Sequence, residues 1–386
     1  MGAVGIIVEY NPMHNGHIFH LQEAIKIANG KPIVAVMSGN FVQRGELSVL
    51  DKYQKARLAL EEGVDIVVEL PFFYSTQSAE IFSIGAMKIL SELGVNTVVF
   101  GSEENNTEKL ILNVKRIIEC ETEIGEFIKK SSKSGTSYPN SIVAAYKENK
   151  IELDLKPNTI LGIEYIKTIL KNQFNIMPVA IKRKNTGYFD EGEIENIASA
   201  SYIRKLMKAG EVDKIKPLVS FSCFEMLKTE SIIGLESLYD MLYYALSHEE
   251  KLNTIQDMEV GLEYRLKKMS KICYNYNEYF NSILCKRYTF SRMQRVLLHI
   301  LLGVDIHMTE YVKENLPYIQ ILGASKNGRT YLKNVQELVS VNIITNIRNK
   351  EKLTEKNRQL FEKALENDNL YAFKRKKKII NIPVMF

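Results

Sequence analysis

The sequence predicts an α/β protein with an N-terminal doubly wound, Rossmann-like parallel sheet, followed by a mainly α-helical C-terminal domain. Three observations support this fold class. In the first hundred residues, strand-like apolar runs alternate with helical patterns. The runs are continuous in Val and Ile, as in parallel strands that helices cover on both faces. After Lys216-Pro217 the periodicity turns helical and strand-like runs become scarce.

The elements follow one another in a regular order. Strands are expected over residues 4–8, 32–37, 65–70, 97–100 and 177–182, because each is a short β-branched run. Helices are expected over residues 17–28, 51–62, 79–93, 158–170 and 199–209, where apolar residues recur at helical spacing. A helical insertion is expected at about residues 105–155. Further helices are expected over residues 293–302 and 355–365, in the second half of the chain. The predicted domains are residues 1–215 and 216–386.

Composition excludes several classes of protein. Of the 386 residues, 45% are hydrophobic and 25% are charged, an ordinary globular balance. No window resembles a membrane span, which needs about 18 or more apolar residues, and the start lacks the features of a signal peptide. Disulfides and a zinc knuckle are disfavoured because the four cysteines are far apart: Cys120, Cys223, Cys273 and Cys285. The expected compartment is the cytoplasm, with no membrane association.

Basic residues gather near the C-terminal end. Residues 348–378 hold 11 Lys or Arg against 5 Asp or Glu, although the net charge of the whole chain is only +5. Such a run can contact RNA phosphates, and the alternative is a solvated surface that keeps the protein in solution. The candidate RNA-binding residues are Lys374, Arg375, Lys376, Lys377 and Lys378.

The first strand leads into an unusual loop. Three of the six histidines, His14, His17 and His20, lie within seven residues just where a helix would begin. Unpaired N–H groups and the positive end of the helix dipole favour phosphate there. Gly16 permits close backbone approach, and His14 and His17 add ring donors. A protein-bound metal is not expected, since no carboxylate or cysteine sits at ligand spacing. Structural capping histidines are a plainer alternative.

Ligands of such sheets bind beyond the carboxyl ends of the strands. His14, Gly39, Asn40, Pro71 and Gly101 all follow or end predicted strands, so we expect them on one rim.

In this context, the His-x-Gly-His motif is a signature of the nucleotidyltransferase superfamily. That superfamily has a second signature, roughly Ile-Ser-Ser-Thr-x-Ile-Arg, and residues 198–204 read Ala-Ser-Ala-Ser-Tyr-Ile-Arg. Ser199 would cap the helix, Ser201 keeps a hydroxyl in place of threonine, and Arg204 would face the β- and γ-phosphates. Both signatures point to attack on the α-phosphorus of a nucleoside triphosphate.

Longer blocks resemble the bacterial tRNA(Met) cytidine acetate ligase family. They are "GIIVEYNPMHNGH", "VMSGNFVQRGELSVLDKYQKARLALEEGVDIVVELPF", "FGSE", "PNTILGIEYIK" and "IKRKNTGYFD". The resemblance is close over residues 1–210 and looser beyond. It implies an enzyme that activates acetate with ATP, as Mg²⁺-ATP, to acetyl-adenylate. The acetyl group then passes to the wobble cytidine of elongator tRNA(Met), giving N4-acetylcytidine. No obligate protein partner is implied.

The resemblance also implies a set of site residues. His14 and His17 are the catalytic candidates. The expected ATP site consists of Ile7, Val8, Glu9, Tyr10, Asn11, Pro12, Met13, His14, Asn15, Gly16, His17, Ile18, Phe19, His20, Gly101, Asn158, Arg183, Ser199, Ser201 and Arg204. We further expect the acyl pocket beside His14 and the loop of residues 38–41.

Two other functions remain open at this stage. A small-molecule adenylyltransferase, acting on pantetheine phosphate or nicotinamide mononucleotide, shares both signatures but is usually shorter. A nucleotide-sensing RNA-binding protein would bind ATP and catalyse nothing.

Overall fold

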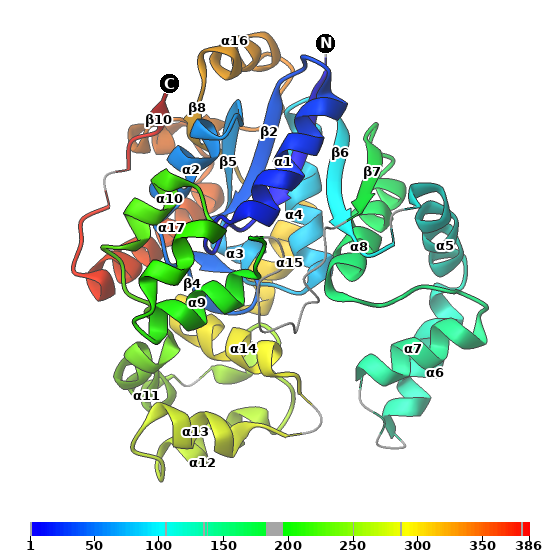
Figure 1. Ribbon diagram of the computed structural model, residues 1–386. Coiled ribbons are helices and arrows are strands. Elements are labelled where there is room, and N and C mark those ends of the chain that lie inside the picture. The colour runs from blue at the N-terminus through cyan, green and yellow to red at the C-terminus, as the bar shows by residue number, and fades with distance from the viewer. Residues whose placement is uncertain are drawn as a thin grey trace.

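The computed structural model describes residues 2–104, 106–133, 136, 138–182, 196–249, 251–285, 288–379 and 381–386. A sheet runs through its centre, and helices cover both faces (Figure 1). The strands are β1 (Ala3–Val8), β2 (Ile33–Ser38), β3 (Phe41–Val42), β4 (Glu46–Leu47), β5 (Ile66–Leu70), β6 (Val95–Ser102), β7 (Met177–Lys182), β8 (Ile319–Ala324), β9 (Ile343–Ile344) and β10 (Val384–Met385).

The large sheet has eight strands. Its order is β10-β8-β5-β2-β1-β6-β7, and β9 pairs with β8. The neighbours are parallel apart from β5 and β8, which are antiparallel. The short strands β3 and β4 form a separate antiparallel hairpin after β2. The carboxyl ends of β1, β2, β5 and β6 therefore share one edge, which is the lower edge in Figure 1.

Helices join these strands and build the rest of the chain. They are α1 (Asn15–Ala28), α2 (Lys52–Glu61), α3 (Phe72–Ser75), α4 (Ala79–Glu92), α5 (Thr107–Glu119), α6 (Glu121–Lys133), α7 (Tyr138–Glu148), α8 (Pro157–Lys171), α9 (Ala200–Lys208), α10 (Phe221–Leu227), α11 (Tyr239–His248), α12 (Leu262–Ser270), α13 (Tyr276–Ile283), α14 (Phe290–Leu302), α15 (Ile306–Glu314), α16 (Lys326–Val335) and α17 (Glu355–Arg375). Short 3₁₀ turns are η1 (Val212–Leu218), η2 (Leu235–Leu238), η3 (Leu252–Thr254) and η4 (Ile347–Lys352).

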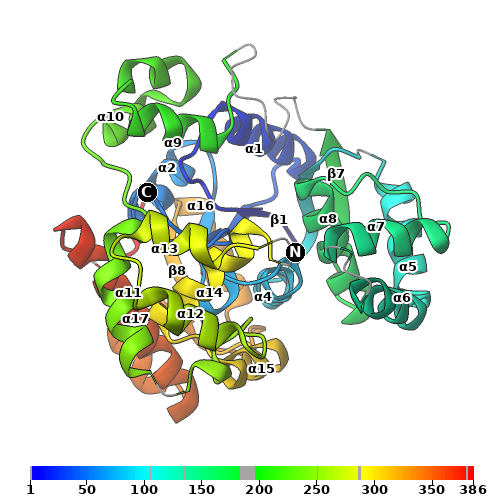
Figure 2. The same ribbon diagram turned by 90° about the horizontal axis from the view of Figure 1, so that it is seen from below.

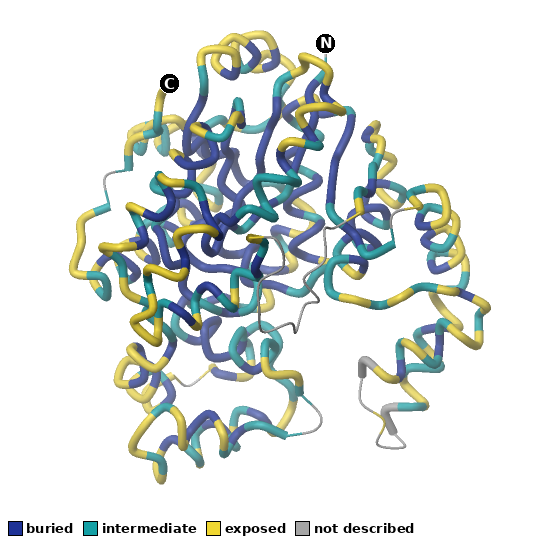
Figure 3. The backbone as a smooth tube through the Cα atoms, viewed as in Figure 1, coloured by how far each residue is buried: buried dark blue, intermediate teal, exposed yellow. Residues whose placement is uncertain are grey.

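Each face of the sheet has its own core because side chains alternate along a strand. Ile6 of β1 and Ala35 of β2 pack with helices α1, α2, α9 and α10. Val34 and Val36 of β2 point the other way, into a core that includes α4, α8, α14 and α17. Figure 3 shows the central strands buried and the outlying helices largely exposed. This two-sided burial explains why the strands read as continuous apolar runs.

The predicted fold class is confirmed: the central sheet is mostly parallel and the C-terminal region is largely helical. The insertion expected near residues 105–155 consists of α5, α6 and α7. The expectation of scarce strands after residue 215 missed β8, which is fully buried beside β5. Its pairing with β5 is long-range, and local periodicity carries no sign of such a partner. The domain boundary near residue 215 stays a prediction.

Two helical parts extend below the carboxyl edge of the sheet. The hairpin of α6 and α7 lies on one side, and helices α11, α12 and α13 lie on the other (Figures 1 and 2). We call α11, α12 and α13, with the segments that join them, the helical lobe.

Candidate active site

The loop from β1 to α1 forms the centre of the candidate site. His14 is the N-cap of α1, and its Nδ1 accepts a hydrogen bond from the backbone N–H of Gly16 at 3.1 Å. His17 accepts the backbone N–H of His14 on its own Nδ1 at 3.3 Å. The pair thus builds a capping box in which histidines replace the usual hydroxyl and carboxylate residues. The capping role is observed, and it engages the Nδ1 of each ring.

This cap fixes the tautomer of both rings. Because each Nδ1 accepts a hydrogen bond, the proton of the neutral imidazole lies on Nε2. The two rings stack with centroids 3.7 Å apart at an interplanar angle of 29°. His14 is buried and His17 is half-buried. Two Nε2–H donors beside a helix N-terminus suit an anionic ligand, so capping and phosphate binding are compatible roles.

Small and polar residues hold the loop in this shape. A Cβ on Gly16 would lie 2.9 Å from Cε1 of His14, so a side chain there would displace the ring. The Asn15 side chain donates to the carbonyls of Asn196 and Pro217 at 2.8 and 2.9 Å. The buried Cys223 thiol donates to the carbonyl of Met13 at 3.3 Å. Residues some two hundred positions later therefore support the loop from behind.

The second signature reaches the same loop. Ser199 caps α9, as predicted, and its hydroxyl lies 2.9 Å from that of Ser201. Arg204 donates to the carbonyl of Asn11 at 2.8 Å and to Glu46 at 2.8 Å. Its side chain is 17% exposed. Arg204 thus lies at the rim with the histidines, with Glu46 of β4 as its counter-ion.

Two further charged residues lie here: Glu9, which belongs to the expected ATP segment, and Arg44, which sequence reasoning missed. Glu9 is half-buried and accepts from the Ser38 hydroxyl at 3.0 Å and from the Gln43 backbone at 2.8 Å, and desolvation of its carboxyl raises its pKa. Arg44, in the turn between β3 and β4, is half-buried, and burial lowers its pKa while Glu46 and Glu9 oppose that change. Arg44 lies in a block that resembles the family but in no short motif. Arg44 thus carries a second guanidinium close to that of Arg204, which donates to the loop that holds the histidines.

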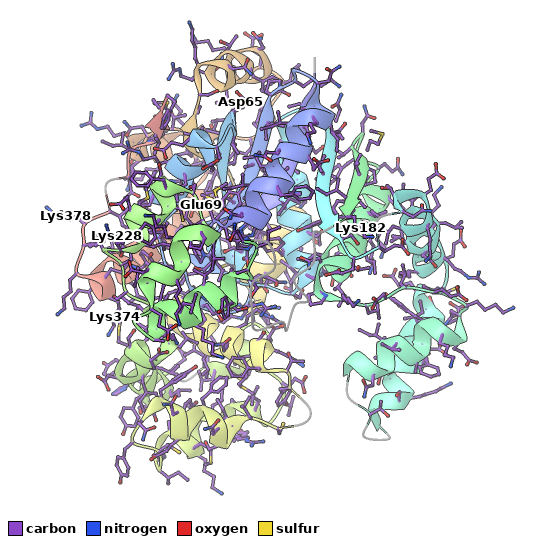
Figure 4. The ribbon with its side chains drawn as sticks, viewed as in Figure 1. Asp65, Glu69, Lys182, Lys228, Lys374 and Lys378 are labelled. Atoms are coloured by element: carbon purple, nitrogen blue, oxygen red, sulfur yellow. The ribbon has the colours of Figure 1, made fainter. Side chains whose placement is uncertain are left out.

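The end of β6 meets α8 through a residue that was also missed. Glu103 accepts from Asn158 Nδ2 at 2.7 Å and from the Thr159 backbone and hydroxyl at 2.9 Å. Gly101 belongs to β6, one position before its end. Asn158 is therefore held at the carboxyl edge by a carboxylate that directly follows β6, the strand next to β1. Arg183, which follows Lys182 (Figure 4), lies outside the described residues.

Several residues of the expected ATP segment support the loop from inside. Val8, Tyr10, Asn11, Pro12 and Met13 are buried. Ile7, Ile18 and Phe19 are half-buried. The His20 Nε2 lies 3.2 Å from the carbonyl of Val99 in β6, which ties α1 to the sheet.

Lys55 of α2 clamps the ends of the first two strands. Its ammonium donates to the carbonyls of Glu9, Ser38 and Gly39 at 3.0, 2.8 and 2.8 Å. The residue is fully buried, and burial lowers its pKa to about 8, against the opposing charge of Glu9. The Glu9 carbonyl follows β1, the Ser38 carbonyl ends β2, and the Gly39 carbonyl follows β2. Lys55 therefore fixes the rim from which the site is built.

A second buried lysine links the rim to the C-terminal region. Lys52 pairs with Glu69 of β5 and Asp368 of α17, each at 2.7 Å. Asn40 donates to Asp368 at 2.7 Å. Burial disfavours the Lys52 charge, but the two carboxylates outweigh it and raise the pKa of Lys52. Burial and the nearby Asp368 charge raise the pKa of Glu69 to about 7. One ammonium serves two carboxylates, so Glu69 tends to keep a proton.

The loop of residues 38–41 faces this ion network. A cavity of about 10 Å³ lies between Gly39, Phe41, Glu69 and Asp368, and such a volume holds about one water molecule. Its carboxylates would also repel acetate. The acyl pocket expected beside His14 and this loop stays a prediction.

Part of the basic run folds back onto the protein. Arg375 pairs with Glu230 at 3.0 Å and donates to the carbonyl of Ser48 at 2.6 Å, and its side chain is 4% exposed. Lys374 donates to the carbonyl of Ser237, and Lys377 pairs with Glu230. Lys376 and Lys378 are exposed. Figure 4 shows Lys374 and Lys378 at the far left of the molecule. RNA binding by this run stays a prediction, and Arg375 has a structural role.

Two general features complete the description. Within the described part of the chain, no three His, Cys, Asp or Glu side chains are grouped to hold a metal ion. None of its helices is both long and apolar enough to span a membrane.

Comparison with known proteins identifies the family of this chain. Residues 1–381 match the family described as HIGH Nucleotidyl Transferase. A tRNA(Met) cytidine acetate ligase from Fusobacterium nucleatum is 39% identical over 398 residues, which span 99% of this chain and 98% of that protein. The ligase of the same name from Caldicellulosiruptor saccharolyticus is 39% identical over 347 residues, or 88% and 86% of the two chains.

Solved structures show the same likeness. The apo crystal structure of Thermotoga maritima TmcAL has a TM-score of 0.93 and 30% identity, and each chain is covered to 100%. The structure of the same protein bound with alpha-thio ATP has a TM-score of 0.89 and 31% identity, again with 100% coverage of both chains.

Proposed function

Because this chain belongs to the HIGH nucleotidyltransferase family and, within it, to the tRNA(Met) cytidine acetate ligases, we propose that it couples two reactions at the rim of the sheet. Acetate and ATP first give acetyl-adenylate and pyrophosphate. The acetyl group then passes to the exocyclic amine of the wobble cytidine in elongator tRNA(Met), with release of AMP. The cytoplasm, where charged tRNA is used, is the compartment that fits.

In the first step, a carboxylate oxygen of acetate forms a bond to the α-phosphorus, and the bond from that phosphorus to the bridging oxygen of pyrophosphate breaks. Acetate is already anionic, so this step needs no base. Its barrier comes from repulsion between the carboxylate and the triphosphate, and fixed donors lower such barriers most.

The observation that carries the proposal is the stacked pair of His14 and His17 at the N-terminus of α1, with both protons directed to Nε2 by the cap. Arg204, which donates to the carbonyl of Asn11 in the same loop, and Arg44 close to it add positive charge. Mg²⁺ would arrive with ATP, held by the phosphate oxygens, and would neutralise further charge. Since the pair is preorganised by backbone hydrogen bonds, its donors need little reorganisation when the phosphate charge shifts.

In the second step, the cytidine amine attacks the acetyl carbonyl carbon, AMP leaves, and the amine loses a proton. Acetyl-adenylate reacts with water, so the site must protect it until the cytidine arrives. The wobble base has to leave the anticodon stack to reach the rim.

Exchange of labelled pyrophosphate into ATP tests the proposal. We expect exchange that depends on acetate and proceeds without tRNA. A small-molecule adenylyltransferase would instead require a phosphorylated acceptor, and a nucleotide sensor would bind ATP without any exchange. Either result would contradict the proposed function. Acetylation of elongator tRNA(Met) then tests the second step.

A further inference from the structure

The helical lobe carries a concentration of exposed aromatic side chains. Within the part of the chain that the structure describes, the exposed tyrosines are Tyr243, Tyr244, Tyr264 and Tyr274, and all four belong to this lobe. Tyr264 is 74% exposed and Tyr274 is 92% exposed. Single exposed apolar residues need no explanation, but a cluster of them marks an interaction surface.

Helix α12 combines these aromatics with positive charge. Leu262, Leu266 and Ser270 are buried along one side of the helix. Tyr264, Lys268 and Lys271 are exposed, and their spacing of four and three residues places them on one face.

The charge balance of this segment is strongly positive. Residues 262–271 hold four Lys or Arg and one Glu. Two of these cations are used inside the lobe, because Arg265 donates to the carbonyls of Ser282 and Leu284 and Lys267 donates to that of Glu249. Lys268 and Lys271 therefore supply the outward charge of the face.

The lobe is connected to the candidate active site through α14, against which α11 packs. The turn between β3 and β4 packs on α14 so closely that a Cβ on Gly45 would lie 2.7 Å from the backbone nitrogen of Arg295. Burial raises the pKa of Tyr276 in α13, and Glu46 is one of the charges that raise it further. Glu46 is also the counter-ion of Arg204. Seen from below, α12, α13 and α14 lie towards the viewer beyond the carboxyl edge of the sheet (Figure 2).

Building on the proposed function, we propose that this face of α12, together with Tyr274 in the segment that follows the helix, binds the anticodon arm of the tRNA. Tyr264 and Tyr274 stack on unpaired loop bases, and Lys268 and Lys271 contact the phosphates between them. Aromatic platforms interleaved with lysines are the usual means of binding single-stranded RNA. Protein interfaces, in contrast, are depleted in lysine. The charge and composition of the face therefore favour RNA over a second protein.

Such a surface meets a need of the reaction. When the wobble cytidine leaves the anticodon stack, its neighbours lose stacking partners, and unstacking costs free energy. In the proposed complex, the exposed tyrosines of the lobe replace those partners. Helix α14, against which α11 of the lobe packs, contacts the hairpin of β3 and β4, and Glu46 of that hairpin pairs with Arg204.

Two double variants of the full-length protein test the assignment, with an elongator tRNA(Met) transcript as the probe. For Tyr264→Ala with Tyr274→Ala, we expect the KM for tRNA in acetylation to rise about tenfold or more, because each stacked base contributes substantially to affinity. For Lys268→Gln with Lys271→Gln, we expect the slope of log affinity against log salt to fall by about 2. Acetate-dependent exchange without tRNA should stay within about twofold of wild type in both.

Matched controls lie on α16, at the opposite end of the molecule (Figure 1). Lys326→Gln with Lys333→Gln removes two exposed lysines there and should change neither quantity. If wild type acetylates the tRNA and both lobe variants keep its KM and salt slope, the assignment is wrong while the proposed function stands. If wild type shows no acetate-dependent exchange, the proposed function itself fails. A wild-type dimer in sedimentation that the tyrosine variant converts to monomers, with tRNA kinetics unchanged, would assign the face to a second copy and overturn the proposal.

Discussion

His14 and His17 each use one ring nitrogen for the helix cap and carry their proton on the other, so that each ring can donate to a phosphate. Replacing either residue with Ala should lower acetate-dependent exchange by a factor on the order of 10² or more, comparable to the loss of one transition-state donor. Folding should be affected less, since loss of an N-cap costs about 1 kcal/mol.

A matched control separates the site from the residue type. His307 of α15 is exposed, so His307→Ala should leave exchange at the wild-type rate. Exchange that survives in both the His14 and His17 variants would remove the histidines from the mechanism. Unfolding curves of all three variants show whether a loss of activity reflects a loss of structure.

Glu69 supplies a prediction on pH. Its ordinary pKa of 4.5 is raised to about 7, first by burial and then by Asp368. Between these values the unfolded chain has lost the Glu69 proton and the folded protein still holds it, so folding becomes less favourable as pH rises through that window. Glu69→Gln cannot lose a proton. Its free energy of unfolding relative to wild type should therefore increase from pH 4.5 to 7, by on the order of 2 kcal/mol.

Urea unfolding of both proteins across that range measures the difference. A constant difference between the two proteins would mean that Glu69 is ionised throughout and fully paired with Lys52. Asp65→Asn, at the opposite end of β5 (Figure 4), is a control for carboxylate removal, and its effect should not follow the same pH window.

Single residues also show where sequence reasoning reached its limit. The His-x-Gly-His motif and Ser199 were recognisable because a motif or a cap is local. Glu103, Arg44 and Lys55 were missed, since their roles depend on partners from other elements. Glu103, for example, meets Asn158 across 55 positions. A lone charged residue has no local mark that distinguishes it from a surface charge.

At the level of elements, α17 divides the basic run into two kinds of residue. Arg375 lies inside, paired with Glu230, whose side chain is 3% exposed. Arg375→Met leaves that carboxylate without its bound guanidinium and should lower the free energy of unfolding by about 3 kcal/mol, as for other broken buried pairs. Denaturant titration measures this change.

The exposed lysines of the same run provide the matched control for Arg375→Met. Lys376→Gln with Lys378→Gln should change stability by no more than about 0.5 kcal/mol. If the run contacts RNA, the variant should weaken tRNA binding and flatten its salt dependence. Unaltered tRNA binding would mean that these lysines form a solvated tail. If the lysine variant lost as much stability as Arg375→Met, the distinction between buried and exposed residues of the run would be wrong.

Most elements of the N-terminal half were predictable because their patterns are local. The run of residues 4–8 became β1, and that of residues 177–182 became β7 with the same bounds. Strand β8 has an equally apolar sequence, yet it lies in a helical context and pairs with β5 from some 250 positions earlier. Its antiparallel direction departs from the βαβ order that identified the other strands.

On the scale of the whole molecule, the candidate catalytic and ATP-binding residues lie before position 215. The sheet that carries them, however, is completed by strands that come after that position. Strand β8 shields the edge of β5, and Asp368 neutralises Lys52. The sequence predicted the catalytic half because its motifs are contiguous. It could not predict this dependence, which exists only between segments that meet in the fold.

This dependence leads to the last prediction. A fragment of residues 1–215 should fail to unfold cooperatively and should show no acetate-dependent exchange. Without the C-terminal region, the apolar edge of β5 is open and prone to aggregate, and the buried Lys52 keeps Glu69 but loses its second carboxylate. Coexpression with residues 216–386 should restore exchange, because the missing strand and Asp368 then return. A fragment that folds and exchanges alone would instead establish residues 1–215 as an independent domain.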